Sequence, residues 1–177
     1  MKIAYGNSRM GIIRMDHTKD EKKIISDYQA AADGDVLDFI NEAEGGSAVR
    51  KYVTVAFLSG DAAQRIKDLT GKEVDGNRVV LDINALRHIQ KRHGKEGQQD
   101  HSMCDPNDIA RMGYVIMNYD DISYDGKTTT GYTGEFGEPA PLVQISKRID
   151  GTYYVIETAS SQKNRKNYVV TAFIGKA

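Results

Sequence analysis

The sequence predicts an α+β fold in which N-terminal helices pack on a C-terminal antiparallel β-sheet. Helix-like segments with polar caps come first, and three strand-like segments, PLVQISKRI, TYYVIETA and NYVVTAFI, follow one another at the end. Asp150-Gly151, between the first two of these strands, is typical of a two-residue hairpin. The 177 residues suffice for one core and a small extension.

The first part of the chain differs from the rest in its residue composition. Residues 1–46 are polar and predict two helices, KDEKKIISDYQAAADG and DVLDFINEAEGG, each closed by glycine. We interpret residues 1–46 as an N-terminal helical extension and residues 47–177 as the α+β domain.

The middle of the chain alternates strand-like and helix-like segments. RKYVTVAFLSG and NRVVLD predict strands, and GDAAQRIKDLTG between them predicts a helix. Asp82 is placed to cap the helix in LDINALRHIQKRHG, and Asp105 to cap the one that begins at DPNDIARMG. YVIMNYDDISY predicts a further strand, and DGKTTTGYTGEFGEPAP is the long irregular loop.

The hairpin at Asp150-Gly151 separates two faces, because its turn pairs Ile149 with Thr152 and Arg148 with Tyr153. The apolar face holds Val143, Ile145, Ile149, Tyr154 and Ile156, together with Lys147. The other face holds Gln144, Ser146, Arg148, Tyr153, Val155 and Glu157 and is suited to line a polar cleft. Strict alternation in the last strand predicts that Thr171 shares a side with Asn167, Val169 and Phe173.

The helix in LDINALRHIQKRHG gathers cations and histidines in its last two turns. His93 falls near the middle of the apolar stripe formed by Leu86 and Ile89, so we expect it to point toward the sheet. His88 lies on a flank of the helix beside Arg92. The two histidines are therefore expected in different environments.

Composition excludes several classes of protein. A formal net charge of -1 excludes a protein that holds nucleic acid by bulk positive charge, so a phosphate site must come from a local cluster of cations. The single cysteine, Cys104, cannot form an internal disulfide. The start, MKIAYGNSRMG, lacks the apolar run of a signal peptide or membrane span. We expect a soluble cytoplasmic protein that does not act at a membrane.

Histidine, carboxylate, cation and hydroxyl side chains around one sheet are the groups needed to cleave RNA without a metal. A base removes the 2'-hydroxyl proton and an acid protonates the leaving 5'-oxygen. Cations or hydroxyl donors stabilise the extra charge on the pentacoordinate phosphate. The products are a 2',3'-cyclic phosphate and a free 5'-hydroxyl.

Five stretches resemble the phage-associated nucleases of the barnase, EndoU, colicin E5/D and RelE fold group: LDINALRHIQKRHG, DPNDIARM, NYDDISYDG, LVQISKRIDGTYYVIETASS and YVVTAFI. The resemblance runs from about Val53 to Ile174. It implies two helical segments followed by a four-stranded antiparallel sheet. It also implies a metal-independent endoribonuclease or toxin of phages and mobile elements.

By this resemblance the catalytic candidates are His93, His88, Glu157, Lys147 and Thr171, and Arg148 is a further candidate of the sheet. The substrate-binding candidates are Arg148 and the cations of the helix end and the turn, Arg92, Lys163 and Arg165. No cofactor and no metal are expected. RNA is the expected partner, and an inhibitor or immunity protein is a further candidate. The cytoplasmic protein is expected to be encoded by a phage or carried in its particle.

Each candidate has a structural alternative. Lys147 can snorkel past the apolar face to solvent, and Arg148 can form an exposed ion pair with Glu157. Thr171 can be a simple strand former, and Lys163 and Arg165 can belong to a solvated turn.

Other function classes predict different behaviour. An inactive RNA- or protein-binding module of the same fold would keep binding after loss of His93. A zinc site at His93, His101 and Cys104 would make the protein sensitive to chelators, although the spacing fits no common pattern. A protein hydrolase is the weakest alternative, because no serine stands in a nucleophile motif.

Overall fold

The computed structural model describes residues 18–46, 50–74, 76–131 and 138–176. The helices are α1 Lys19–Gln29, α2 Gly34–Glu44, α3 Gly60–Thr70, α4 Ile83–His93, α5 Pro106–Ala110 and α6 Met112–Met117. The strands are β1 Tyr52–Phe57, β2 Arg78–Asp82, β3 Asp121–Ser123, β4 Thr128–Thr129, β5 Ala140–Pro141, β6 Val143–Ile149, β7 Thr152–Ser161 and β8 Lys166–Gly175. None of the helices in these ranges is long and apolar enough to cross a bilayer.

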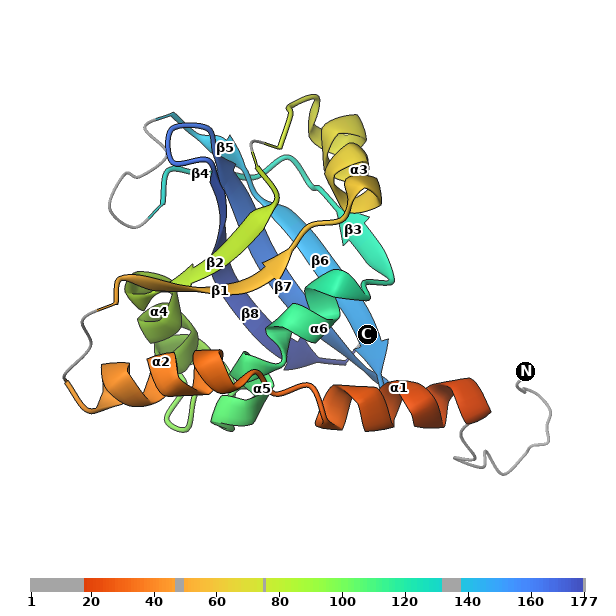
Figure 1. Cartoon of the computed structure of the whole chain (residues 1–177), viewed down its shortest axis with the longest axis vertical. Helices are drawn as coiled ribbons and strands as arrows, with labels where there is room; N and C mark the ends of the chain where they lie inside the picture. The colour runs from red at the N-terminus through yellow and green to blue at the C-terminus, as the bar shows by residue number, and fades with distance from the viewer. Residues whose placement is uncertain (1–17, 47–49, 75, 132–137, 177) are drawn as a thin grey trace.

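The strands form one large sheet with the order β1-β2-β8-β7-β6-β3, and helices α1, α2, α5 and α6 lie over one of its faces (Figure 1). This arrangement confirms the predicted α+β class. The sheet has six strands and is mixed, which corrects the four-stranded antiparallel sheet that the resemblance implied. The reason is that β2 joins β8 in parallel, through Val79↔Asn167 and Val80↔Tyr168, and brings β1 with it.

The helices begin where the sequence places acceptor side chains. Thr18 and Glu21 form a reciprocal capping box at α1, and Asp33 caps α2. Asp82 Oδ1 accepts from the Ala85 N–H at 2.7 Å and starts α4. Asp105 caps α5, as predicted. These caps fix the first turn of α4 directly after β2.

The β6–β7 hairpin has the predicted register. Asp150 and Gly151 both have positive φ, 50° and 78°, as a two-residue primed turn requires. Ile149 pairs with Thr152, and the ladder continues outward to Val143 and Thr158. The predicted division into a buried face and a partly exposed face is therefore confirmed.

The last strand departs from strict alternation. Glu157 pairs with Thr171, but the next residue, Thr158, pairs with Val169, so β8 carries one extra residue at Val170. Thr171 therefore lies on the opposite face from Val169 and Asn167. The prediction that these three residues share a side was wrong, because the bulge reverses the alternation.

YVIMNYDDISY was predicted as a strand, but its first part is helical. Residues 112–117 form α6, which buries Met112, Val115 and Ile116, and only Asp121–Ser123 forms a strand. Short apolar runs fit either structure, and here packing against β1 selects the helix. A Cβ on Gly113 would lie 2.3 Å from the Val55 carbonyl oxygen, so glycine permits this close approach.

The core forms between the helices and the apolar face of the sheet. Ile145, Tyr154 and Ile156 of the hairpin belong to the same buried cluster as Phe39 and Ile40 of α2. Tyr28 of α1 belongs to the same cluster, so both helices predicted as an N-terminal extension contribute side chains to this core. The other face of the sheet carries the partly exposed residues of β6 and β7.

Candidate active site

Two cross-strand rows of side chains lie on the face of the sheet opposite the core. The first row is Gln144, Glu157 and Thr171, and the second is Ser146, Val155 and Phe173. All but Thr171 are partly exposed, whereas their sequence neighbours in β6 and β7 are mostly buried. This face is where the sheet can meet a ligand.

Helix α4 brings the histidines to this face. Its stripe of Ala85, Leu86 and Ile89 is fully buried, and the helix packs against β8. The half-buried His88 is close enough to Glu157 for the carboxylate charge to act on its imidazole. His88, Glu157 and Thr171 therefore form a cluster between α4 and the first row.

The environment of His88 favours the neutral imidazole. Burial is the largest cause that lowers its pKa, followed by the positive charges of Arg92 and His93, while Glu157 acts in the opposite direction. Glu157 itself accepts a hydrogen bond from Gln144 Nε2 at 2.9 Å. At neutral pH the cluster thus contains a neutral histidine beside a fixed carboxylate.

Thr171 is 9% exposed, and its hydroxyl has no hydrogen-bond partner within the described residues. A buried hydroxyl without a partner costs roughly 1–3 kcal/mol relative to one that is satisfied. A ligand that supplies the missing partner would explain such a group in a polar cluster. The pairing of Thr171 with Glu157 places it beside the carboxylate.

His93 is held more tightly than His88. It is 5% exposed, its ring stacks on Phe173 with centroids 5.4 Å apart, and its Nδ1 lies 3.0 Å from Asp100 Oδ1. Because Asp100 engages Nδ1, Nε2 is the nitrogen left for proton transfer. The prediction that His93 faces inward and His88 lies on a flank is confirmed.

Asp100 is itself fixed by the segment that follows α4. Its Oδ1 accepts the Ser102 N–H at 2.9 Å, and Ser102 Oγ accepts the Ile174 N–H at 3.0 Å. Burial acts to raise the pKa of Asp100, but the hydrogen bonds from Ser102 and His93 outweigh it and lower this pKa. Sequence reasoning missed Asp100 and Ser102. Their one signal was an acidic residue seven positions after His93.

Lys147 does not join this cluster. It lies on the core face, is 6% exposed, and its Nζ is 3.1 Å from Asp120 Oδ1. Asp120 Oδ2 also accepts the Arg148 N–H at 2.8 Å, which ties the buried ammonium to the strand. Lys147 is therefore an ion-paired residue of the core face and does not reach solvent by snorkelling.

The four candidate substrate-binding cations are dispersed. Arg92 is next to His88 on α4, where its Nε donates to Gln99 Oε1 at 3.1 Å. Arg148 is exposed on the polar face, two rows from Glu157, and Glu157 bonds to Gln144 instead of to Arg148. Lys163 and Arg165 are exposed on the β7–β8 turn, roughly 13 Å beyond Glu157 at the usual strand rise.

The three residues considered as zinc ligands, His93, His101 and Cys104, do not converge on one point. His93 contacts Asp100, and His101 Nδ1 lies 3.1 Å from the Gly94 carbonyl oxygen. Cys104 is exposed. In the parts of the chain that the structure describes, no three histidine, cysteine or acidic side chains are grouped as metal ligands.

The fold and the site define a class of protein: an α+β domain that gathers two histidines, a carboxylate and an unsatisfied hydroxyl beside one sheet face. The family follows from sequence comparison. Residues 57–177 match the model of a family described as phage-Barnase-EndoU-ColicinE5/D-RelE like nuclease3. Because the match spans more than half of the chain, the chain belongs to this nuclease family, which confirms the resemblance. No curated protein and no solved structure matches the chain.

Proposed function

We propose that this protein is an endoribonuclease that uses the 2'-hydroxyl of RNA as its nucleophile and needs no metal. The observation that carries the proposal is the cluster of His88, Glu157 and the unpaired Thr171 hydroxyl on the polar sheet face. The nuclease family supports phosphodiester cleavage as the reaction.

The two histidines are suited to opposite roles, because different neighbours act on them. The pKa of His88 is lowered, chiefly by burial and then by nearby cations, so its neutral imidazole can accept the 2'-hydroxyl proton. Glu157 then stabilises the imidazolium that forms. His93, whose Nδ1 contacts Asp100, donates a proton from Nε2 to the leaving 5'-oxygen.

Hydrogen-bond donors and cations near the row of Gln144, Glu157 and Thr171 stabilise the negative charge on the scissile phosphate. The Thr171 hydroxyl donates to a non-bridging oxygen and so gains the partner it otherwise lacks. Arg92 supplies positive charge beside His88, and Arg148 adds a more distant cation two rows away on the same sheet face. The 2'-oxygen bonds to phosphorus as the P–O5' bond breaks, which leaves a 2',3'-cyclic phosphate and a 5'-hydroxyl.

The test is cleavage of mixed tRNA, rRNA and mRNA by the purified protein in excess chelator, with the product ends analysed. His88→Ala and His93→Ala are compared with His101→Ala, which replaces an exposed histidine outside the cluster. We expect cyclic phosphate ends from the wild type and from His101→Ala, and strongly reduced cleavage by the other two variants. A folded wild type that binds RNA but cleaves none of these classes would be a binding module and would overturn the proposal.

A further inference from the structure

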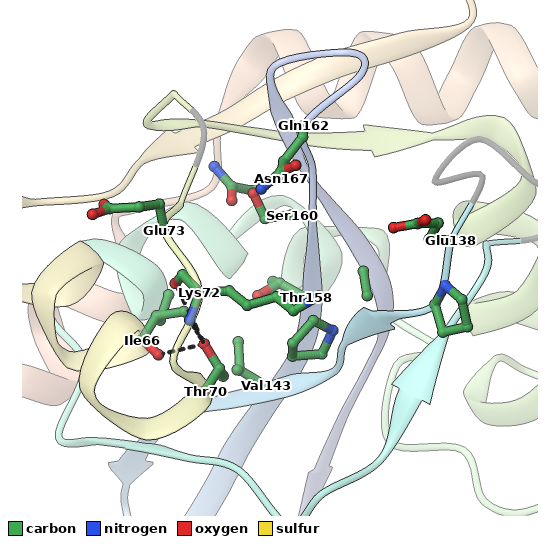
Figure 2. Close-up of a pocket in the computed structure, with 13 residues that line it drawn as sticks. Ile66, Thr70, Lys72, Glu73, Glu138, Val143, Thr158, Ser160, Gln162 and Asn167 are labelled. Carbon is green, nitrogen blue, oxygen red and sulfur yellow. Dashed lines mark hydrogen bonds between the residues drawn. The ribbon is translucent and has the colours of Figure 1, made fainter.

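A pocket lies away from the polar sheet face, at the end of the sheet where α3, β5 and the β7–β8 turn meet. Figure 2 shows Ile66, Thr70 and Lys72 along one side and Glu138 on the other, with Thr158 between them. Nothing in the proposed cleavage reaction uses these residues. The pocket is therefore a separate feature that needs its own explanation.

Two deeply buried polar side chains line the pocket. Thr158 and Asn167 are each 2% exposed. The Asn167 amide nitrogen donates to the carbonyl oxygens of Gly76 at 3.2 Å and Arg78 at 3.0 Å, so the side-chain oxygen is the atom left for a ligand. Buried polar groups that are held in place in this way set the orientation of a bound molecule.

Part of the lining is apolar and suited to cover the face of a flat molecule. Val143 and the prolines Pro139 and Pro141 supply apolar surface. About 630 Å³ of empty space lies within the pocket and in the open solvent at its mouth.

Charge at the pocket argues against a phosphate as the ligand. Glu73, Glu138 and a single lysine, Lys72, line it. Glu73 also pairs with Lys67 at 2.6 Å, so Glu138 is the carboxylate best placed to accept hydrogen bonds from a ligand. A carboxylate favours groups that donate N–H, such as the exocyclic amine of a base.

The β7–β8 turn connects this pocket with the polar face. Gln162 of the turn lines the pocket, and the next residues include the exposed cations Lys163 and Arg165. The turn lies roughly 13 Å along β7 from Glu157. An RNA strand that leaves the cleavage site along β7 would pass these cations within a few nucleotides and reach the mouth of the pocket.

We propose that the pocket binds one unstacked base of the RNA substrate, a few nucleotides from the cleaved bond, and selects bases that carry an exocyclic amine. Glu138 accepts the amine, the Asn167 oxygen and Thr158 hydroxyl contact the base edge, and the apolar surface covers its face. Adenine, cytosine and guanine meet this requirement, and uracil does not. The inference rests on the proposed function, since it names the substrate feature that the nuclease reads.

The first experiment measures nucleoside binding to the whole chain by NMR, independently of cleavage. Adenosine, cytidine and guanosine are expected to shift the backbone amide signals of Thr158 and Asn167, whereas uridine is expected to bind at least several-fold more weakly. Glu138→Gln removes the exposed carboxylate charge with little risk to folding and should weaken amine-bearing nucleosides about tenfold. Glu96→Gln makes the same change at an exposed carboxylate outside the pocket lining, so it is the matched control and should leave nucleoside binding unchanged.

The second experiment maps cleavage of an RNA library. The wild type should prefer amine-bearing bases at one position away from the cut, and Glu138→Gln should lose this preference while its product ends stay the same. Equal binding of uridine, shifts confined to the polar face, or an unchanged preference in Glu138→Gln would overturn the pocket assignment. Selective nucleoside binding without any RNA cleavage would keep the pocket and reject the ribonuclease.

Discussion

At the scale of single residues, the candidate site is a set of groups whose protonation and bonding differ from those of ordinary surface side chains. His88 is kept neutral by burial and cations, and Thr171 has a buried hydroxyl with no partner in the described chain. Neither feature improves folding. Both are explained if a phosphate and its proton transfers complete the cluster.

Thr171→Val replaces the unsatisfied hydroxyl with a methyl group of the same shape. We expect RNA cleavage to fall by about 10- to 100-fold, because a hydrogen bond to a charged phosphate is lost. Folding stability should change by no more than about 1 kcal/mol and can rise, since a buried polar group is removed. Denaturant unfolding and a cleavage assay measure the two effects, and Thr171→Ser should restore activity. Equal cleavage by the valine variant would remove Thr171 from the site.

The lowered pKa of His88 sets the acid side of the pH profile. A general base must be unprotonated, so kcat/KM should fall as the pH drops through the His88 pKa, which lies below the ordinary 6.5. His88→Ala should lower kcat/KM by about 10²- to 10⁴-fold and remove this limb, whereas His101→Ala should leave it in place. A limb that persists in His88→Ala would assign the base to another residue.

Asp100→Asn tests the carboxylate that contacts His93. Because the folded-state pKa of Asp100 lies below the ordinary value of 3.8, its charge stabilises the fold above that pH, and this contribution is lost as the pH falls through the lower value. Unfolding measured across this acidic range should show a flatter pH dependence for the Asn variant, which should also be less stable at neutral pH. Parallel curves for the two proteins would mean that the contact adds no stability.

At the scale of secondary-structure elements, the sequence predicted the features that are determined by neighbouring residues in the chain. The primed turn at Asp150-Gly151 fixed the hairpin register, and Asp82 fixed the start of α4. It did not predict the bulge at Val170, because an extra residue in a ladder leaves no mark in the apolar pattern. It also did not predict α6, whose short apolar run is ambiguous without its partner strand β1.

Gly113→Ala tests the close approach of α6 to β1. An added Cβ would lie 2.3 Å from the Val55 carbonyl oxygen, so the backbone must shift, and we expect a loss of about 1–3 kcal/mol in unfolding free energy. Gly60→Ala is the matched control at the first residue of α3, where an added Cβ meets nothing within 4 Å. Comparable stability of the two variants would show that the contact can relax without cost.

At the scale of the whole molecule, the site depends on segments far apart in the chain. Pairing between β6, β7 and β8 places Gln144, Glu157 and Thr171 in one row. Helix α4 brings His88, which lies more than fifty residues earlier in the chain, to this row. The sequence predicted most of these residue types but could not decide which came together. The hairpin pattern placed Lys147 on the apolar face and Glu157 on the polar face, but it did not predict that Asp120 pairs with Lys147 there.

The parallel pairing of β2 with β8 could not be predicted from local sequence either, because it joins strands separated by most of the domain. It places α4, which follows β2 directly, against β8. The Ser102–Ile174 hydrogen bond then holds the segment after α4 on the same strand. The position of both histidines is therefore a property of the complete fold.

The most direct test of the central claim uses a DNA oligonucleotide that contains a single ribonucleotide, incubated with the purified protein in excess chelator. Attack by the 2'-hydroxyl predicts one cut, directly after the ribonucleotide, with a 2',3'-cyclic phosphate on one product and a 5'-hydroxyl on the other. Cleavage at deoxynucleotides, or of the matching oligonucleotide without the ribose, would contradict the account and point to a different nuclease chemistry.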